Sequence, residues 1–219
     1  MLLAGIASLA SAENYVIGGN IVAPNSEPHI LSLQRSSHFC GGTVVSATHG
    51  MTAAHCYYSP SIVSAVAGAH NIKQNESTQQ KVGLTKFQRH PNYNSNNISN
   101  DIAVLEFASS LTLNEYVVPA KLPAHVDGEW MSENDVIHVC GWGNTLVIGS
   151  NYPSELHCVD TLYVPVSKCN ARTSYNGSIL PGNLNQKLWY HLRNGRIQHY
   201  LRYVLCWRTR SRRQRRMPR

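Results

Sequence analysis

Short apolar segments separated by turn-forming residues run through most of this chain, and no long window repeats apolar residues at helical spacing. Such segments are typical of β-strands bounded by Asn, Ser, Gly and Pro. Many short strands at this spacing predict an all-β sandwich or barrel. We expect strands at 29–34, 64–69, 81–87 and 101–107, with a connector between two halves of the chain near Pro119 and Pro123.

The formal net charge of +7 is distributed unevenly along the 219 residues. Residues 184–219 contain 11 Lys and Arg and no Asp or Glu, whereas residues 1–183 contain 8 Lys and Arg against 12 Asp and Glu, giving −4. A mildly acidic globular body therefore precedes a basic tail. Taken alone, this tail has the composition of a nucleic-acid-binding arm. No apolar run reaches the roughly 18 residues that a membrane span needs, so no membrane partner is expected.

The N-terminal segment has the pattern of a secretory signal. Residues 1–12 are apolar or small and end in Ala-Ser-Ala, the small-x-small pattern of a signal peptidase site. Sequons at Asn75, Asn97 and Asn176 are acceptors for N-glycosylation and agree with secretion. We therefore expect a secreted, extracellular glycoprotein with a signal peptide at 1–12. In an oxidising compartment its six cysteines can pair, in many alternative connectivities.

Two stretches carry residues suited to general acid–base chemistry. Cys40 and Cys56 lie 16 residues apart and can staple a hairpin, which would fix the turn that presents His55. Asp101 opens an apolar strand. An imidazole is the usual general base for a hydroxyl nucleophile and needs a carboxylate to orient it. Taken singly, however, such an Asp is more often a turn or cap residue, and such a His a surface or core residue.

Together, these stretches resemble the chymotrypsin/trypsin family of serine proteases. The similarity lies in four motifs in the family's order and spacing: Val16–Gly19 at the mature N-terminus, Thr52–Cys56 around the histidine, Asp101–Leu105 around the aspartate, and Cys140–Thr145 in the second barrel. The resemblance implies an all-β, two-barrel chymotrypsin-like Greek-key fold over residues 16–181. It also implies a zymogen with a short propeptide at 13–15, activated by freeing Val16.

The resemblance assigns roles to the candidate residues. His55 would be the general base, Asp101 would orient its imidazole, and Cys40 would pair with Cys56. The expected partners are protein or peptide substrates and protease inhibitors. The chain is expected to be a monomer and to need no cofactor. A glycan on Asn97, four residues before Asp101, would crowd the cleft.

Other positions depart from the family. Residues 68–72 resemble its calcium loop, but Ala69 stands where an acidic ligand often lies, so calcium is not expected. No spacing of His and Cys residues resembles a closed zinc site, so no other metal is expected either. Cys140 and Cys169 would lose their family partners. Cys158 is expected to have no partner, because the usual mate position holds Val22.

The family's nucleophile segment, Gly-Asp-Ser-Gly-Gly, does not occur in the 219 residues. Read in a shifted codon frame, residues 203–208 permit Met-x-Cys-Ala-Gly and residues 213–219 permit Gly-Lys-Asp-Ala-Cys-Gln, both of which resemble the family just before its serine. Our hypothesis is that 182–219 is an aberrant basic tail, translated from a retained intron and then the next exon out of frame. The first barrel would then be complete and the second incomplete.

This chain is therefore expected to be inactive, whereas the intact product would be a serine endopeptidase cutting after Lys or Arg. Two alternatives stand beside this interpretation. One is a secreted pseudoprotease that binds without cutting. The other takes the tail as a nucleic-acid-binding arm, although nucleic acid is not an expected partner of a secreted body.

Overall fold

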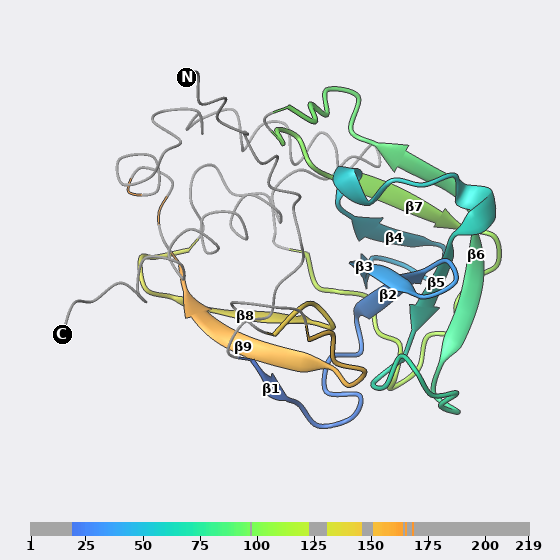
Figure 1. The fold of residues 1–219 in the computed structure, drawn as a ribbon, viewed down its shortest axis with the longest axis horizontal. Helices are drawn as coiled ribbons and strands as arrows, with labels where there is room; N and C mark the ends of the chain where they lie inside the picture. Colours follow the sequence, from blue (N-terminus) through green and yellow to red (C-terminus); the bar gives the residue numbers. More distant parts are fainter. Residues whose placement is uncertain are drawn as a thin grey trace, which may run out of the picture.

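A computed structural model describes residues 19–96, 98–122, 131–145, 151–163, 165 and 168 (Figure 1). The described part of residues 19–163 consists of nine strands and two short 3-10 turns and contains no α-helix. The strands form two antiparallel sheets, one of them closed. The elements are β1 (Asn20–Ile21), β2 (Ile30–Gln34), β3 (His38–Val44), β4 (His49–Thr52), η1 (Ala54–Cys56), η2 (Pro60–Ile62), β5 (Ser64–Ala67), β6 (Gln80–Arg89), β7 (Ala103–Phe107), β8 (Val136–Gly141) and β9 (His157–Leu162).

Six strands close into a barrel in the order β2-β3-β4-β7-β6-β5. Every pair is antiparallel, including β2 with β5 and β4 with β7, which are not consecutive in the chain. Alternate residues point inward, so β7 buries Ala103, Leu105 and Phe107. The four expected strands are confirmed as β2, β5, β6 and β7, and only their ends differ, by one or two residues. The all-β barrel expected from the sequence is therefore present.

Close packing inside the barrel leaves no room for a side chain at Gly50. A Cβ at this position would lie 2.8 Å from Leu31 Cδ1 and 2.9 Å from Phe107 Cζ. Leu31 and Leu105 are fully buried beside it in the same apolar cluster. Such packing across the barrel is what fixes one strand arrangement among the alternatives.

The second sheet has the order β1-β9-β8. The short β1 pairs with the beginning of β9, and β9 pairs with β8 along its whole length. Trp142 directly follows β8, and Leu156 directly precedes β9. Both pack against Val66 of β5 and against Ala69, which follows β5, in a second buried cluster. Apolar contact therefore joins this sheet to the closed barrel.

The expectation that Cys158 has no partner is wrong, because the structure forms a Cys140–Cys158 disulfide. The register of β8 and β9 places these two residues directly opposite each other, with their Cα atoms 4.1 Å apart. This distance is typical of the closely spaced pairs of an antiparallel ladder. Although Val22 occupies the family's usual mate position, Cys140 on the adjacent strand supplies the partner of Cys158.

Several expectations lie outside the described residues. These are the signal peptide at 1–12, the propeptide at 13–15, the N-terminus at Val16, the sequons at Asn97 and Asn176, the thiol of Cys169, and the tail at 182–219.

Candidate active site

Strand pairing brings His55 and Asp101 together across 46 positions of sequence. His55 lies in η1, three residues after β4 ends, and Asp101 lies two residues before β7 begins. Because β4 and β7 are antiparallel neighbours and Thr52 pairs with Ala103, the end of one strand meets the start of the other. The two side chains therefore lie at the same end of the barrel.

Asp101 holds both the backbone and the ring of His55. Its Oδ1 accepts the His55 backbone N–H at 2.8 Å, and its Oδ2 lies 2.7 Å from His55 Nδ1. The Asp101 side chain is 6% exposed and that of His55 is 25% exposed. A buried carboxylate that accepts from Nδ1 fixes the imidazole tautomer with Nε2 available for a proton. This geometry is the one that an acid–base pair next to a nucleophile requires.

The turn that carries His55 is stapled from two sides. Cys56, the next residue, forms a disulfide with Cys40 on β3, with a Cα–Cα distance of 6.1 Å. Thr52 Oγ1 donates a hydrogen bond of 2.7 Å to the carbonyl of Gly41. β3 therefore anchors the turn at the position where β4 ends, and the imidazole has little freedom to leave Asp101.

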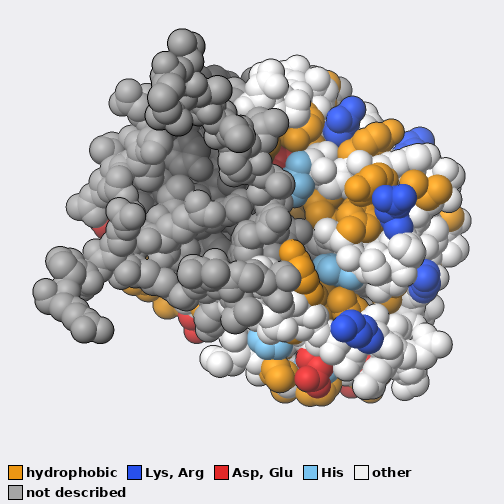
Figure 2. Space-filling view, in the orientation of Figure 1, with side chains coloured by type: hydrophobic (Ala, Val, Ile, Leu, Met, Phe, Trp, Pro, Cys, Tyr) orange, Lys and Arg blue, Asp and Glu red, His pale blue; other side chains and the backbone are white. Residues whose placement is uncertain are grey.

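Aromatic and basic side chains flank the pair on one side. A cavity of about 450 Å³ is lined by residues that include Tyr57, Arg89 and Tyr93. The Arg89 guanidinium lies 4.6 Å from the Tyr57 ring centroid and 5.9 Å from that of Tyr93. Burial and the nearby Asp101 charge raise the pKa of Tyr93, although Arg89 opposes this. The space-filling view shows such apolar and basic side chains intermingled over the barrel (Figure 2).

In the loop that resembles a calcium site, the carboxylate of Glu76 accepts hydrogen bonds from the loop itself. Glu76 accepts the backbone N–H of His70 at 2.7 Å and of Asn71 at 3.0 Å, and the amide N–H of Gln79 at 2.9 Å. These bonds hold the pKa of Glu76 below its ordinary value, although burial alone would raise it. Because protein donors already occupy this carboxylate and Ala69 offers no side-chain oxygen, the residues present do not fit calcium.

No hydroxyl group of the described residues hydrogen-bonds to His55. The nearest side-chain partner of its Nε2 is the disulfide sulfur of Cys56, at 3.5 Å. A sulfur in a disulfide cannot act as a nucleophile for acyl transfer in the way that a serine hydroxyl does. The described residues therefore provide a base and its orienting acid without the group that the base would activate.

A closed antiparallel barrel with a buried Asp and a His joined at its edge defines a protein of the chymotrypsin-like β-barrel class. Sequence comparison gives the family. The Trypsin family profile matches residues 16–188. The chain is 37% identical over 173 residues to Trypsin-3 of Salmo salar, 35% over 179 residues to Trypsin of Xenopus laevis, and 36% over 172 residues to Trypsin of Sus scrofa.

The chain therefore belongs to the Trypsin family of serine endopeptidases, which act on protein substrates and bind protease inhibitors. The three matches cover 79%, 82% and 78% of this chain and 69%, 70% and 71% of the respective relatives. Among the described residues, no helix is both long and apolar enough to cross a membrane.

Two features of the site region have no signal in the sequence. His38 is half-buried beside Trp142, with its Nδ1 2.8 Å from Ser32 Oγ, and desolvation lowers its pKa to about 4. The second feature is the Cys140–Cys158 disulfide. Both depend on contacts between segments that only the folded chain brings together.

Proposed function

We propose that this chain is a catalytically inactive member of its family, with the acid–base pair of a serine endopeptidase but no nucleophile. One observation carries the proposal: Asp101 orients His55 while no described hydroxyl group lies at its Nε2. The 219 residues also contain no Gly-Asp-Ser-Gly-Gly segment. Without a serine and its oxyanion-hole donors, the His–Asp pair has no acyl-transfer step to assist.

Labelling with a fluorophosphonate probe tests this proposal directly. Such a probe forms a bond only with an activated serine, so the purified 219-residue chain should remain unlabelled and should not hydrolyse Lys or Arg peptide substrates. The matched control is the product of the same transcript from which the bases between the second base of codon 182 and the second base of codon 202, both included, are removed, which restores the other frame. After its propeptide is removed to free Val16, this product should be labelled and active. Labelling of the 219-residue chain that depends on His55 would overturn the proposal.

The tail from 182 to 219 is explained in the same proposal as an out-of-frame product. Its support is the charge contrast between tail and body and the family-like peptides permitted in the shifted frame. Sequencing the transcript and the gene across codon 182 tests this explanation. Splice signals at both ends of the segment support it, whereas a continuous frame without such signals contradicts it.

The remaining features of the proposal concern processing and location. We propose a signal peptide at 1–12, a propeptide at 13–15, and secretion as a monomer with glycans at Asn75, Asn97 and Asn176. Asn75 is exposed on the turn that precedes Glu76, which agrees with access for a glycosyltransferase. N-terminal sequencing and glycosidase treatment of the secreted protein test these features; an uncleaved N-terminus or an unchanged mass would contradict them.

A further inference from the structure

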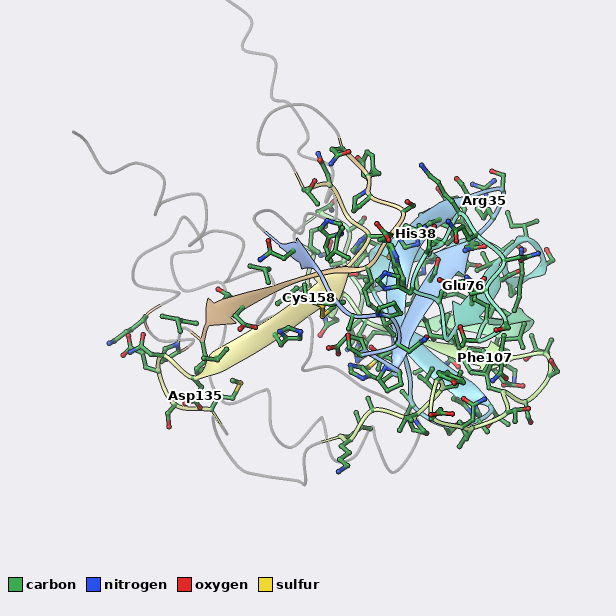
Figure 3. The ribbon with its side chains drawn as sticks, turned by 90° about the horizontal axis from the view of Figure 1, so that it is seen from below. Arg35, His38, Glu76, Phe107, Asp135 and Cys158 are labelled. Carbon is green, nitrogen blue, oxygen red and sulfur yellow. A yellow bond between two sulfur atoms is a disulfide. The ribbon has the colours of Figure 1, made fainter. Side chains whose placement is uncertain are left out.

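Four metal-binding side chains converge where the second sheet meets the barrel. They are Glu27, His138, Cys140 and Cys158, and one potential ligand atom from each lies within 4.8 Å of all the others. His138 and Cys140 lie two apart on β8, and therefore on one face, while Cys158 lies opposite Cys140 on β9. Glu27 reaches this face from the segment before β2. Cys158 lies at this junction in Figure 3.

The distance between the two ligands that are not cysteines already suits a small divalent cation. His138 Nε2 lies 3.4 Å from Glu27 Oε1. Ligand atoms around tetrahedral Zn²⁺ at ordinary bond lengths are separated by roughly 3.3–3.8 Å. One cation between these two atoms could therefore bind both with little movement of either side chain.

A second carboxylate orients the imidazole for this role. Asp160 pairs with His138 in the strand register, and its Oδ1 lies 2.5 Å from His138 Nδ1. Histidine ligands of metals commonly donate their other ring N–H to a carboxylate, which fixes the tautomer and increases the basicity of the coordinating nitrogen. In this chain that arrangement directs Nε2 toward Glu27 and the cysteine pair.

We propose that these four residues form a Zn²⁺ site when the Cys140–Cys158 disulfide is reduced. Two molecules of a thiol reductant would break the S–S bond, become a disulfide themselves, and leave two cysteine thiols. Each thiol would release its proton to solvent on binding the metal. Two thiolates, one imidazole nitrogen and one carboxylate oxygen then complete a tetrahedral set that zinc favours. Oxidation removes two ligands, so metal binding and the disulfide exclude each other.

A second group, formed by Cys40, His55 and Cys56, is less suited to zinc. It offers only three ligands, and Asp101 already fixes its imidazole from the other side. In the four-residue group the ligands come from three separate segments, so no spacing in the sequence reveals it. The expectation that the chain holds no metal rested on Ala69 in the calcium-like loop and on the spacing of His and Cys residues along the chain.

Cobalt titration of the reduced full chain tests the proposal, because Co²⁺ bound by thiolates has a strong charge-transfer absorption. We expect this absorption in the reduced wild-type chain, its displacement by Zn²⁺, and its loss in the oxidised chain. The double variant Cys140→Ser/Cys158→Ser should also lose it. Equal binding by the oxidised chain, or absorption that persists in the double variant, would overturn the proposal.

Single substitutions separate ligation from general structural damage. His138→Ala and Glu27→Gln should each weaken Co²⁺ binding by about 10- to 100-fold. His138→Cys should retain binding, since it replaces one zinc ligand by another. His157→Ala is the matched control, because His157 adjoins Cys158 on the same strand but points to the opposite face. If His157→Ala weakens binding as much as His138→Ala does, or if neither has an effect, the assignment of His138 is wrong.

Discussion

Asp101 contributes to the structure at the end of the barrel as well as to the proposed acid–base pair. Its two oxygens accept from the backbone and the ring of His55, and the side chain is 6% exposed. Removing a buried acceptor leaves its donors without partners, which costs more than the net value of the bonds. The orientation of His55 and the stability of the barrel edge are therefore coupled at this residue.

Asp101→Ala should lower the free energy of unfolding by about 2–4 kcal/mol, because it leaves two donors of His55 unpaired. Urea unfolding of the oxidised chain measures this change. Glu115→Ala is the control, since Glu115 is exposed, and it should change stability by less than about 0.5 kcal/mol. Equal stability of the two variants would contradict the structural role of Asp101.

His38 should make stability dependent on pH in the mildly acidic range. Burial lowers its pKa to about 4 in the folded chain, whereas the ordinary value is 6.5. The unfolded chain therefore binds a proton first, and stability present above pH 6.5 is lost as the pH falls from 6.5 toward 4. This loss should reach about 2–3 kcal/mol.

The comparison that checks this prediction is His38→Gln, which cannot titrate. Unfolding free energies measured between pH 4 and 7 should fall less steeply for this variant than for the wild type. Parallel slopes for the two proteins would show that another group causes the acid sensitivity.

At the scale of elements, the loop between β5 and β6 links the two sheets. Gly68 begins this loop with φ +68°, and a Cβ there would lie 2.3 Å from the Thr78 carbonyl oxygen, so only glycine fits without strain. The carbonyl of His70 accepts hydrogen bonds from Trp142 Nε1 and from the Leu156 backbone, each at 3.0 Å. Glu76 holds the same segment from inside the loop, so its carboxylate supports the contact between the sheets.

Glu76→Gln should destabilise the chain by about 1–3 kcal/mol at neutral pH, since it replaces charge-assisted hydrogen bonds by neutral ones. The Glu76 pKa is lowered by folding, so its contribution is present above the unfolded pKa and is lost as the pH falls through the folded value. The wild type and the variant should therefore converge in stability in acid. Urea unfolding at neutral and acidic pH checks this; a difference that persists in acid would contradict it.

Over the whole molecule, the two sheets differ in how fully they are buried. The barrel encloses one apolar cluster, and because it is closed, none of its strands is an unpaired edge strand. In the three-stranded sheet, Ile21 is 56% exposed and Val136 is 63% exposed. Backbone hydrogen bonds in poorly buried elements open at lower free energy than those in a closed core. The barrel should therefore be the more stable unit.

Hydrogen exchange measured by mass spectrometry should show this difference. Amides of β2, β5 and β7 should exchange at least about tenfold more slowly than those of β8 and β9, because a difference of about 1.4 kcal/mol in opening free energy is a factor of ten. Measurement after reduction of the two disulfides in the described part of the chain is the control for their contribution. Faster or equal exchange in the barrel strands would contradict the prediction.

The strand pattern, the family motifs and the location of His55 and Asp101 could all be read from the sequence. Local alternation of side chains specifies strands, and short motifs keep their residue types and spacing along the chain. The ends of strands were less predictable: β7 begins at Ala103 rather than at residue 101. Asp101 lies outside the ladder, and this position leaves its carboxylate free to meet His55.

The tertiary structure decided which segments far apart in sequence come into contact. Pairing of β8 with β9 chose the partner of Cys158, and the same register placed Asp160 beside His138. Likewise, the half-buried ring of His38, whose pKa desolvation lowers, lies edge-on against Trp142 with ring centroids 5.5 Å apart. The sequence by itself determined the family, the strands and the two residues of the proposed acid–base pair, because these depend on local order along the chain. Strand register and packing determined the cysteine pairing, the closed loop at Glu76 and the proposed zinc cluster, because each needs atoms that only the folded barrel and sheet bring within bonding distance.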